Sequence, residues 1–175
     1  MVEIIWVGRG GQGAFTAAKI LGTAYSVTSK SHQALVFPSF GPERRGAPIR
    51  AFTRLDKKSI LDRSQIEAAD YIVVLEEDLV SADLLKALKP TGVLIVNTEK
   101  SSFEDKRIQG LNASEIAQTV LNIKMVNTTM LFYLSRHFLK LSRQSLRDGM
   151  ALNMSAKIAD KNEKLLNFFE EEVGV

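Results

Sequence analysis

Cysteine is absent from this chain of 175 residues, and its absence excludes several kinds of chemistry. Without a thiolate the chain supplies no Cys ligand to an iron–sulfur cluster, forms no disulfide and has no cysteine nucleophile. Histidine is nearly as scarce, because only His32 and His137 occur, and neither has carboxylates at metal-ligand spacing beside it. The sequence therefore predicts no metal site, and we interpret both histidines as structural.

Long hydrophobic runs are also missing. The longest apolar runs, such as Tyr71 to Leu75, are far too short to cross a bilayer. No basic segment precedes the strand-like pattern that starts at Val2, so we expect no secretory signal and a cytoplasmic location. With 45% hydrophobic and 25% charged residues, the composition is that of an ordinary globular protein. No repeat or linker divides the sequence, and we expect residues 1–175 to form one domain.

Acidic residues are lacking from one long stretch. The net charge of +3 is a mild excess, and its scattered Lys and Arg residues favour a solvated surface over nucleic-acid binding. No Asp or Glu occurs between Glu3 and Glu43, whereas Arg9, Lys19 and Lys30 do. We therefore expect this part of the chain to present a positive face, suited to anionic ligands or an acidic neighbouring subunit.

Strand-like and helix-like patterns alternate along the chain. The predicted strands are Val2–Val7, Gln33–Phe37, Ile49–Leu55, Asp70–Leu75, Gly92–Val96 and Arg107–Leu111. The predicted helices run from the Gly10–Gly13 turn to Ser29, over Ser81–Leu88 (closed by Pro90 and Gly92), over Ala113–Leu121 and Met130–Leu141, and onward from Ser142. This alternation predicts an α/β fold, a three-layer Rossmann-like domain with a mostly parallel sheet and C-terminal helices.

The C-terminal helices carry apolar faces. Asn127 and Thr128 are predicted N-caps for the helix that follows them. The apolar face of that helix consists of Met130, Leu131, Leu134, Phe138 and Leu141, and that of the last helix of Leu165, Leu166, Phe168, Phe169 and Val173. We expect both faces to be buried, in part against a partner subunit.

The first predicted strand leads into a glycine loop, Gly8-Arg9-Gly10-Gly11-Gln12-Gly13. The pattern G-x-G-x-x-G between a strand and a helix is typical of dinucleotide binding, but that function also needs an acidic residue at the end of the second strand for the ribose. Here the second strand ends at Phe37-Pro38-Ser39, and no acid precedes Glu43. A tight turn combined with an interface is therefore favoured over nucleotide binding, although a helix N-terminus can still attract an anion.

A second constrained loop, the arginine loop, extends from Pro38 to Pro48. It holds three of the four prolines and places Glu43, Arg44 and Arg45 between Pro42 and Gly46. Guanidinium groups bind carboxylates and phosphates in a bidentate way, and a stiff loop reduces the entropy lost on binding. We favour a contact surface over a plain exposed turn, and its partner is either a protein or a ligand.

Together the two loops resemble the gamma subunit of 2-oxoacid:ferredoxin oxidoreductases. Phe37 through Phe52 (FPSFGPERRGAPIRAF) is similar to the second signature of the pyruvate/2-oxoisovalerate branch. The runs Asp70–Leu75, Lys89–Thr98 and Val126–Leu131 look like the same family, whereas Phe132-Tyr133-Leu134 is bulkier than is typical there. The resemblance covers most of the chain.

This resemblance implies a non-catalytic subunit of an enzyme that oxidatively decarboxylates a 2-oxoacid with coenzyme A and passes electrons to ferredoxin or flavodoxin. In such enzymes thiamine diphosphate, Mg²⁺ and the iron–sulfur clusters belong to the complex, whose other chains are the alpha, beta and ferredoxin-like delta subunits. It implies no nucleic-acid or membrane partner and no catalytic residue in this chain. The residues implied in cofactor binding or subunit contact are Gly8, Arg9, Gly10, Gly11, Gln12, Gly13, Ser39, Glu43, Arg44 and Arg45.

One alternative function is kept beside this one, a stand-alone Rossmann-type nucleotide-binding protein. The missing ribose acid disfavours it. The absence of Cys ligands and of a catalytic constellation also predicts that the isolated chain is iron-free and inactive as an oxidoreductase.

Overall fold

The computed structural model describes residues 1–39 and 48–173, with side chains described as far as residue 171. Its strands are β1 (Val2–Arg9), β2 (Gln33–Pro38), β3 (Pro48–Asp56), β4 (Ala69–Val74), β5 (Leu88–Asn97) and β6 (Ile108–Leu111). Its helices are α1 (Ala14–Ser26), α2 (Ala82–Lys86), α3 (Ala113–Leu121), α4 (Asn127–Tyr133), α5 (Arg143–Asn153) and α6 (Ala156–Val173). A 3₁₀ turn, η1 (Glu77–Leu79), and a π-helical turn, η2 (Leu134–Phe138), complete the described elements.

The strands form one sheet in the order β2-β3-β1-β4-β5-β6. β1, β4, β5 and β6 pair in parallel, while β3 is antiparallel to both β1 and β2. Five of these six strands therefore run in one direction, which confirms the predicted α/β fold with its mostly parallel sheet. The order differs from a Rossmann sheet, in which the second strand lies beside the first. Here β3 lies between β1 and β2 and is antiparallel to both. Consecutive strands such as β2 and β3 can pair in this way without a long crossover connection.

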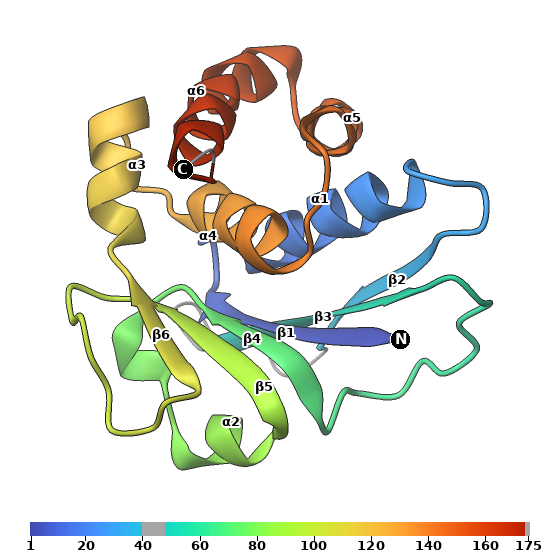
Figure 1. Cartoon of the computed structure of the whole chain (residues 1–175), viewed down its shortest axis with the longest axis vertical. Helices are drawn as coiled ribbons and strands as arrows, with labels where there is room; N and C mark the ends of the chain where they lie inside the picture. Colours follow the sequence, from blue (N-terminus) through green and yellow to red (C-terminus); the bar gives the residue numbers. More distant parts are fainter. Residues whose placement is uncertain (40–47, 174–175) are drawn as a thin grey trace.

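The two faces of the sheet are covered unequally (Figure 1). α1, α3, α4, α5 and α6 gather on one face, and their apolar side chains form the larger core around Trp6 and Leu131. The opposite face has the short α2 and the smaller core around Ile72 and Leu84. Three layers are present as predicted, but nearly all the helical mass lies on one side. β4 is buried on both faces, since Ile72, Val73 and Val74 have no exposed surface.

The C-terminal apolar faces are buried within the chain itself. Met130, Leu131 and Leu134 are fully buried, Leu141 is 6% exposed and Phe138 packs at the edge of the same core. In α6, Leu165, Leu166 and Phe169 are fully buried, and Phe168 packs against them. The predicted burial is confirmed; the side chain of Val173 lies outside the described part.

Several predicted boundaries were wrong. Asn127 and Thr128 do not cap a helix, because α4 already includes them and its N-cap is Val126. Both are 4% exposed, and the Asn127 side chain instead donates a hydrogen bond to the Gly13 carbonyl oxygen at 3.3 Å. Pro90 and Gly92 do not close a helix either, since both lie inside β5, which starts at Leu88 beside an irregularity in its pairing with β4. A bulged strand accommodates Pro and Gly, and here the strand pairing outweighed the local helix-stop signal.

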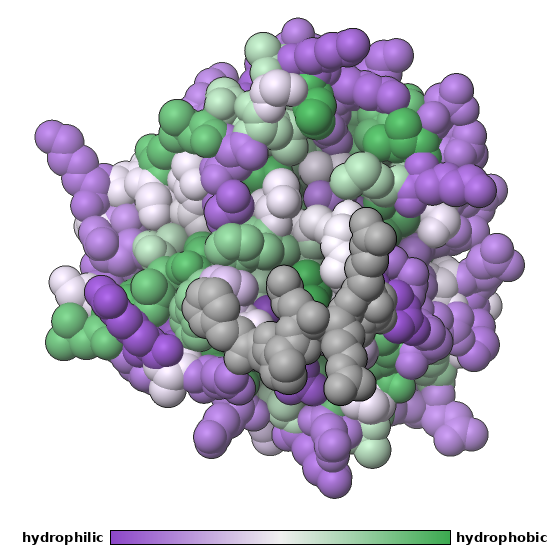
Figure 2. Space-filling model, turned by 180° about the vertical axis from the view of Figure 1, so that it is seen from behind, coloured by the Kyte–Doolittle hydropathy of each residue, from purple (hydrophilic) through white to green (hydrophobic). Residues whose placement is uncertain are grey.

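The surface carries few large apolar groups. Figure 2, seen from behind, shows apolar residues near the middle of that face with hydrophilic residues around them. Among the described residues, no helix has the length and apolar character needed to span a membrane.

Candidate functional site

The carboxyl edge of the sheet holds the glycine loop and the described ends of the arginine loop. The glycine loop leaves β1 there, and Pro48, which ends the arginine loop, pairs with Arg9 across the β1–β3 ladder. The segment after β4 reaches the same edge, because β1 and β4 are parallel neighbours. The chain turns to one side after β1 and to the other after β4, and ligands in open α/β sheets bind at such a switch point. This edge is the candidate site.

The glycines of the first loop have different physical roles. Gly13 has a φ of 82°, and a Cβ there would lie 2.5 Å from Asn127 Nδ2. Gly8 is packed tightly, because its Cβ would lie 3.0 Å from Leu75 Cδ1. Gly11 has a φ of 91°, whereas a Cβ on Gly10 would meet nothing within 4 Å. Three of these glycines are thus explained by a tight turn and by close packing, and Gly10 alone is not.

A polar clamp closes over the glycine loop. Arg9 Nε donates to Glu76 Oε2 at 2.6 Å, and the same guanidinium bonds Asp78. Gln12 accepts a hydrogen bond from the Arg9 backbone N–H at 2.6 Å and donates one to Glu76. The hydrogen bonds that Arg9 donates to Glu76, and then to Asp78, raise the pKa of Arg9 above its usual value. We call Arg9, Gln12, Glu76 and Asp78 the loop clamp.

The clamp corrects the predicted positive face. That prediction counted charges between Glu3 and Glu43, but the acids that face Arg9 come from 67 and 69 positions farther along the chain. Tertiary pairing brings two carboxylates to one guanidinium, so the loop is not a simple cationic surface. An anion can approach the start of α1, where no acidic residue occurs in the first turn, but only beside these carboxylates.

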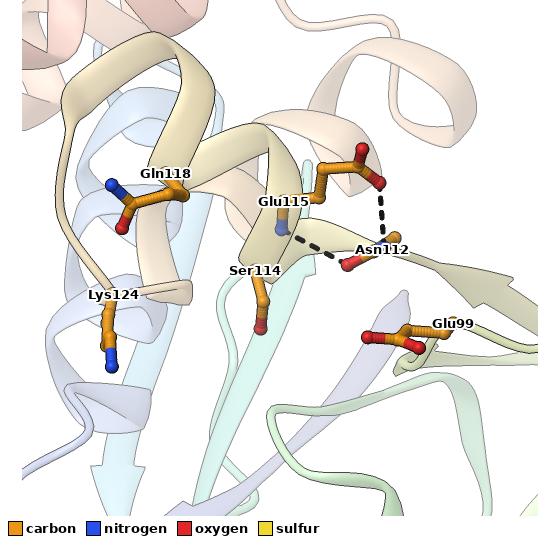
Figure 3. A pocket seen from close by; sticks show the side chains of 6 residues that line it. All are labelled: Glu99, Asn112, Ser114, Glu115, Gln118 and Lys124. Atoms are coloured by element: carbon orange, nitrogen blue, oxygen red, sulfur yellow. Dashed lines mark hydrogen bonds between the residues drawn. The ribbon is translucent and has the colours of Figure 1, made fainter.

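A polar groove extends the candidate site along the carboxyl ends of β5 and β6 (Figure 3). It has a volume of about 560 Å³ and is lined by Glu99, Asn112, Ser114, Glu115, Gln118 and Lys124. Asn97, at the end of β5, holds the lining residue Ser114 in place. Its amide nitrogen donates to the Leu75 carbonyl oxygen at 3.1 Å and to Ser114 Oγ at 3.0 Å. Asn112 Oδ1 caps α3 by accepting the Glu115 N–H at 3.1 Å.

Glu77 lies between the two clamp carboxylates, Glu76 and Asp78, in the sequence, and it bonds to residues that follow β5. Glu77 accepts a hydrogen bond from Thr98 Oγ1 at 2.5 Å and pairs with Lys100. The hydrogen bond from Lys100, followed by that from Thr98, lowers the pKa of Glu77. Paired polar side chains therefore follow the ends of β1, β4 and β5 at this edge in the described structure.

The remaining predicted site residues are only partly described. Ser39 donates its backbone N–H to the Arg50 carbonyl oxygen at 2.8 Å, so it extends the β2–β3 pairing. Glu43, Arg44 and Arg45 lie outside the described residues. No three His, Asp or Glu side chains in the described ranges are grouped closely enough to hold a metal ion.

Sequence reasoning missed the residues that oppose the glycine loop. Glu76, Glu77 and Asp78 follow an apolar strand directly, and so do Asn97 and Thr98 after the next one. Polar residues at the ends of parallel strands meet at one edge, and this signal was present in the sequence. Asn127 gave no such signal, because its contact with Gly13 depends on how α4 crosses α1.

Both histidines have structural surroundings. His32 stacks on Tyr25 with ring centroids 4.4 Å apart and contacts Thr28 Oγ1. His137 lies in η2 with its ring 4.3 Å from that of Tyr133. Neither lies among the side chains described at the carboxyl edge.

Known proteins resemble the chain over nearly its whole length. The family model "Pyruvate ferredoxin/flavodoxin oxidoreductase" matches residues 3–167. The pyruvate/ketoisovalerate oxidoreductases common subunit gamma of Pyrococcus furiosus is 39% identical over 173 residues, covering 94% of this chain and 92% of its own length. The pyruvate synthase subunit PorC of Methanothermobacter marburgensis is 41% identical over 175 residues, covering 99% and 98%.

Solved structures agree with the fold and with the family. The pyruvate oxidoreductase subunit PORC of Thermotoga maritima superposes with a TM-score of 0.80 at 31% identity, covering 97% of this chain and 95% of that one. A 2-oxoglutarate:ferredoxin oxidoreductase from Magnetococcus marinus shares the fold at a TM-score of 0.78 and 15% identity, and this chain matches only 31% of it. The chain belongs to the pyruvate ferredoxin/flavodoxin oxidoreductase family.

Proposed function

We propose that this chain is the gamma subunit of a pyruvate-type 2-oxoacid:ferredoxin or flavodoxin oxidoreductase. The observation that carries the proposal is the match to gamma and PorC subunits over 92–98% of their own lengths, with no large part left over on either side. The complex oxidises a 2-oxoacid with coenzyme A to acyl-CoA and CO₂, and the two electrons released pass to ferredoxin or flavodoxin. The proposal includes a cytoplasmic location, which suits the ordinary globular composition of the chain.

The division of labour follows from the residues. Because the chain has no cysteine, the iron–sulfur clusters belong to another subunit, and we assign them to a ferredoxin-like delta chain. We assign thiamine diphosphate and its Mg²⁺ to the alpha and beta chains. The gamma chain contributes a rigid α/β body whose carboxyl edge contacts the partner subunits or lines the coenzyme A pocket.

The site within this function is the carboxyl edge with its two loops. Its glycine-loop residues are Gly8, Arg9, Gly10, Gly11, Gln12 and Gly13, and its arginine-loop residues are Ser39, Glu43, Arg44 and Arg45. The Pro48–Arg9 pairing supports joint action of the loops, since it ties the end of one to the start of the other. At Gly10, neither close packing nor a positive φ requires glycine. The close approach of a ligand or a partner subunit would explain a glycine at this position.

The alternative Rossmann-type nucleotide-binding function loses support from the sheet order. The ribose acid of that fold projects from the strand beside β1, and here the strand beside β1 is the antiparallel β3. Calorimetry of the isolated chain with NAD(P), FAD and coenzyme A separates the functions, because tight binding of a dinucleotide by the chain alone contradicts the gamma-subunit proposal.

Reconstitution tests the function directly. The chain is combined with alpha, beta and delta subunits, and pyruvate-dependent reduction of a viologen dye is measured with and without coenzyme A. Activity is expected only when all the chains are present. Turnover by the purified chain alone contradicts the proposal, as does full activity of a complex that lacks it.

The double variant Arg44→Ala/Arg45→Ala tests the arginine loop. Each lost charged hydrogen bond is expected to cost about 1.5–3 kcal/mol, seen as a raised KM for coenzyme A or as weaker assembly. Lys replacements should restore only part of the loss, because a point charge replaces a planar fork. The matched control is Lys57→Ala/Lys58→Ala, two exposed cations beyond the far end of β3. Equal behaviour of the two double variants contradicts the assignment.

A further inference from the structure

β2 is an edge strand of the sheet, and the backbone groups on its outer side can pair with a further strand. Only β3 pairs with it among the described strands. Ser39 donates its N–H toward β3, to Arg50, which fixes the alternation along the strand. Leu35 and Phe37 therefore also bond toward β3, and the backbone groups of Ala34, Val36 and Pro38 point outward.

These outward groups form a short template for another strand. Ala34 and Val36 each offer an N–H and a C=O, and Pro38 offers a C=O. Proline at the last outward position fits an edge strand, because its missing N–H is not needed in the β2–β3 ladder. An edge left in this state binds extended segments unless it is covered.

Two hollows flank this edge, one on each face of the sheet. On the α1 face, a hollow of about 370 Å³ is lined by Lys19, Gly22, Thr23, Ser26, Val27, Ala34, Val36 and Asn153. On the other face, a hollow of about 490 Å³ is lined by Leu35, Val36, Phe37, Pro38, Arg63 and Gln65. Successive side chains of an added strand point to opposite faces, so they fall alternately into the two hollows. Backbone pairing plus alternating pockets is the geometry of strand addition.

The charges select the occupant. Each hollow is lined by one cation, Lys19 or Arg63, and the described lining residues include no acid. Lys19 lies with its Nζ 5.3 Å from the Phe15 ring, so its position on α1 is defined. A second copy of this chain would bring the same two cations to the contact, and like charges disfavour it.

We propose that β2 accepts an extended segment of a partner subunit that presents both acidic and apolar side chains on each of its two faces. The segment pairs with the backbone of Ala34, Val36 and Pro38. Its acidic side chains face Lys19 and Arg63, and its apolar side chains fill the rest of the hollows. This inference goes beyond the proposed function and depends on it only for the source of the segment.

Residue-resolved hydrogen exchange tests the pairing in the assembled enzyme. In the free chain the amides of Ala34 and Val36 should exchange much faster than those of Leu35 and Phe37, which are bonded to β3. Assembly should slow exchange at Ala34 and Val36 by more than about tenfold, because their protection then depends on opening of the subunit contact. Unchanged exchange at both amides in an active complex overturns the inference and leaves the proposed function intact.

Charge reversal tests the choice of partner. Lys19→Glu/Arg63→Glu should weaken assembly by about tenfold or more, since it places like charges against the segment. The matched control Lys30→Glu/Lys57→Glu makes the same change in net charge at exposed residues that line neither hollow. Equal effects of the two pairs contradict the inference.

A peptide titration needs no assembly and keeps the two proposals separable. A capped hexapeptide Val-Val-Glu-Glu-Val-Val, whose adjacent Glu side chains point to opposite faces, is added to the isolated chain at millimolar concentration. It should shift the amide resonances of Ala34 and Val36. The same peptide with Lys in place of Glu should not. Shifts with neither peptide, or equal shifts with both, overturn the inference. Concentration-dependent dimerisation through β2 also overturns it, because a second copy is then the occupant.

Discussion

Two arginine clusters lie near opposite ends of β1, and they differ in burial. Arg54 pairs across the ladder with Glu3, near the start of β1, and is 2% exposed. Arg9 ends β1 at the carboxyl edge, and its side chain is 34% exposed. Arg54 binds protein on all sides, whereas Arg9 meets carboxylates at the surface where loops gather. The comparison contrasts a buried arginine that connects segments of the fold with a partly exposed arginine at the candidate site.

The contacts of Arg54 explain its structural role. Its Nε donates to Glu3 Oε1 at 3.1 Å, and Nη1 donates to the carbonyl oxygens of Asp62 and Ser64 at 3.0 and 2.7 Å. Nη2 pairs with Asp62 at 3.2 Å, and the guanidinium lies over the Phe37 ring. One side chain thereby fixes the connection between β3 and β4 onto the sheet, and this compensates for the loss of its hydration.

The largest expected effect is on Arg54. Arg54→Ala should destabilise the chain by about 3–5 kcal/mol, because it removes the donor of two carbonyl oxygens and leaves Glu3 with Lys89 as its remaining cation. Urea unfolding monitored through the single Trp6 measures the change. Arg54→Lys should keep part of the stability, since it retains the charge but loses the fork. A loss below 1 kcal/mol, on the order expected of a surface pair, would break the distinction between the clusters.

The second largest effect on stability is expected at Gly13 in the glycine loop. It tests whether some residues of the carboxyl edge are needed for the fold. Gly13→Ala places a side chain at a φ of 82° and against the Asn127 amide, so we expect a loss of about 1–3 kcal/mol. Gly10→Ala is the matched control, because a Cβ there meets nothing within 4 Å. Its stability should stay within about 0.5 kcal/mol of wild type or rise slightly, as the unfolded chain loses freedom. Equal losses in both variants would contradict the assignment of turn strain to Gly13.

The sequence predicted the strands and helices of the fold better than it predicted the partners of Arg54 and Arg9. Apolar runs and turn residues are local, so the strands, α3 and the helical C-terminal part were predictable, as was the burial of Leu134 and Phe169. Ile49–Leu55 was predicted as a strand, but nothing local indicated that Arg54 would be buried or that residues 62–64 would cover it. In the same way, the clamp on Arg9 depends on acids 67 and 69 positions away. The family signatures indicated the glycine loop, but local pattern did not reveal the charges that oppose it.

A smaller effect on stability is expected at Arg9, with a larger one on function. Arg9→Ala removes ion pairs at the surface, which contribute little to stability because water and salt screen them. In the reconstituted enzyme the same change should raise KM for coenzyme A or weaken assembly, as the proposed site requires. Arg107→Ala is the control, because Arg107 is also 34% exposed and carboxylate-bound, at the opposite edge of the sheet. Loss of function in both variants, or in neither, would contradict a special role for the carboxyl edge.

The smallest expected effect on stability is at Asp105. It tests whether the burial of an arginine pair, or only its place at the amino edge of the sheet, decides how much the pair stabilises the fold. This carboxylate lies at the same amino edge of the sheet as Arg54 but is partly exposed, and it accepts a hydrogen bond from Arg107 Nη2 at 2.7 Å. The hydrogen bond from the Arg107 side chain, together with the Arg107 backbone N–H, lowers the pKa of Asp105 to about 2. Because the folded pKa lies below the unfolded value of about 3.9, the pair stabilises the fold above that pH, and this contribution is lost as the pH falls toward 2.

An NMR titration of the Asp105 carboxyl carbon checks this pKa, with a midpoint expected at about 2. Arg107→Ala should move the midpoint up toward about 3.9, whereas Lys106→Ala, which removes a neighbouring exposed cation, should move it much less. The same Arg107→Ala chain should lose little stability near neutral pH, since water can replace the partner of a partly exposed carboxylate. If it instead unfolded as readily as Arg54→Ala, position at the amino edge and not burial would decide which arginines hold this fold.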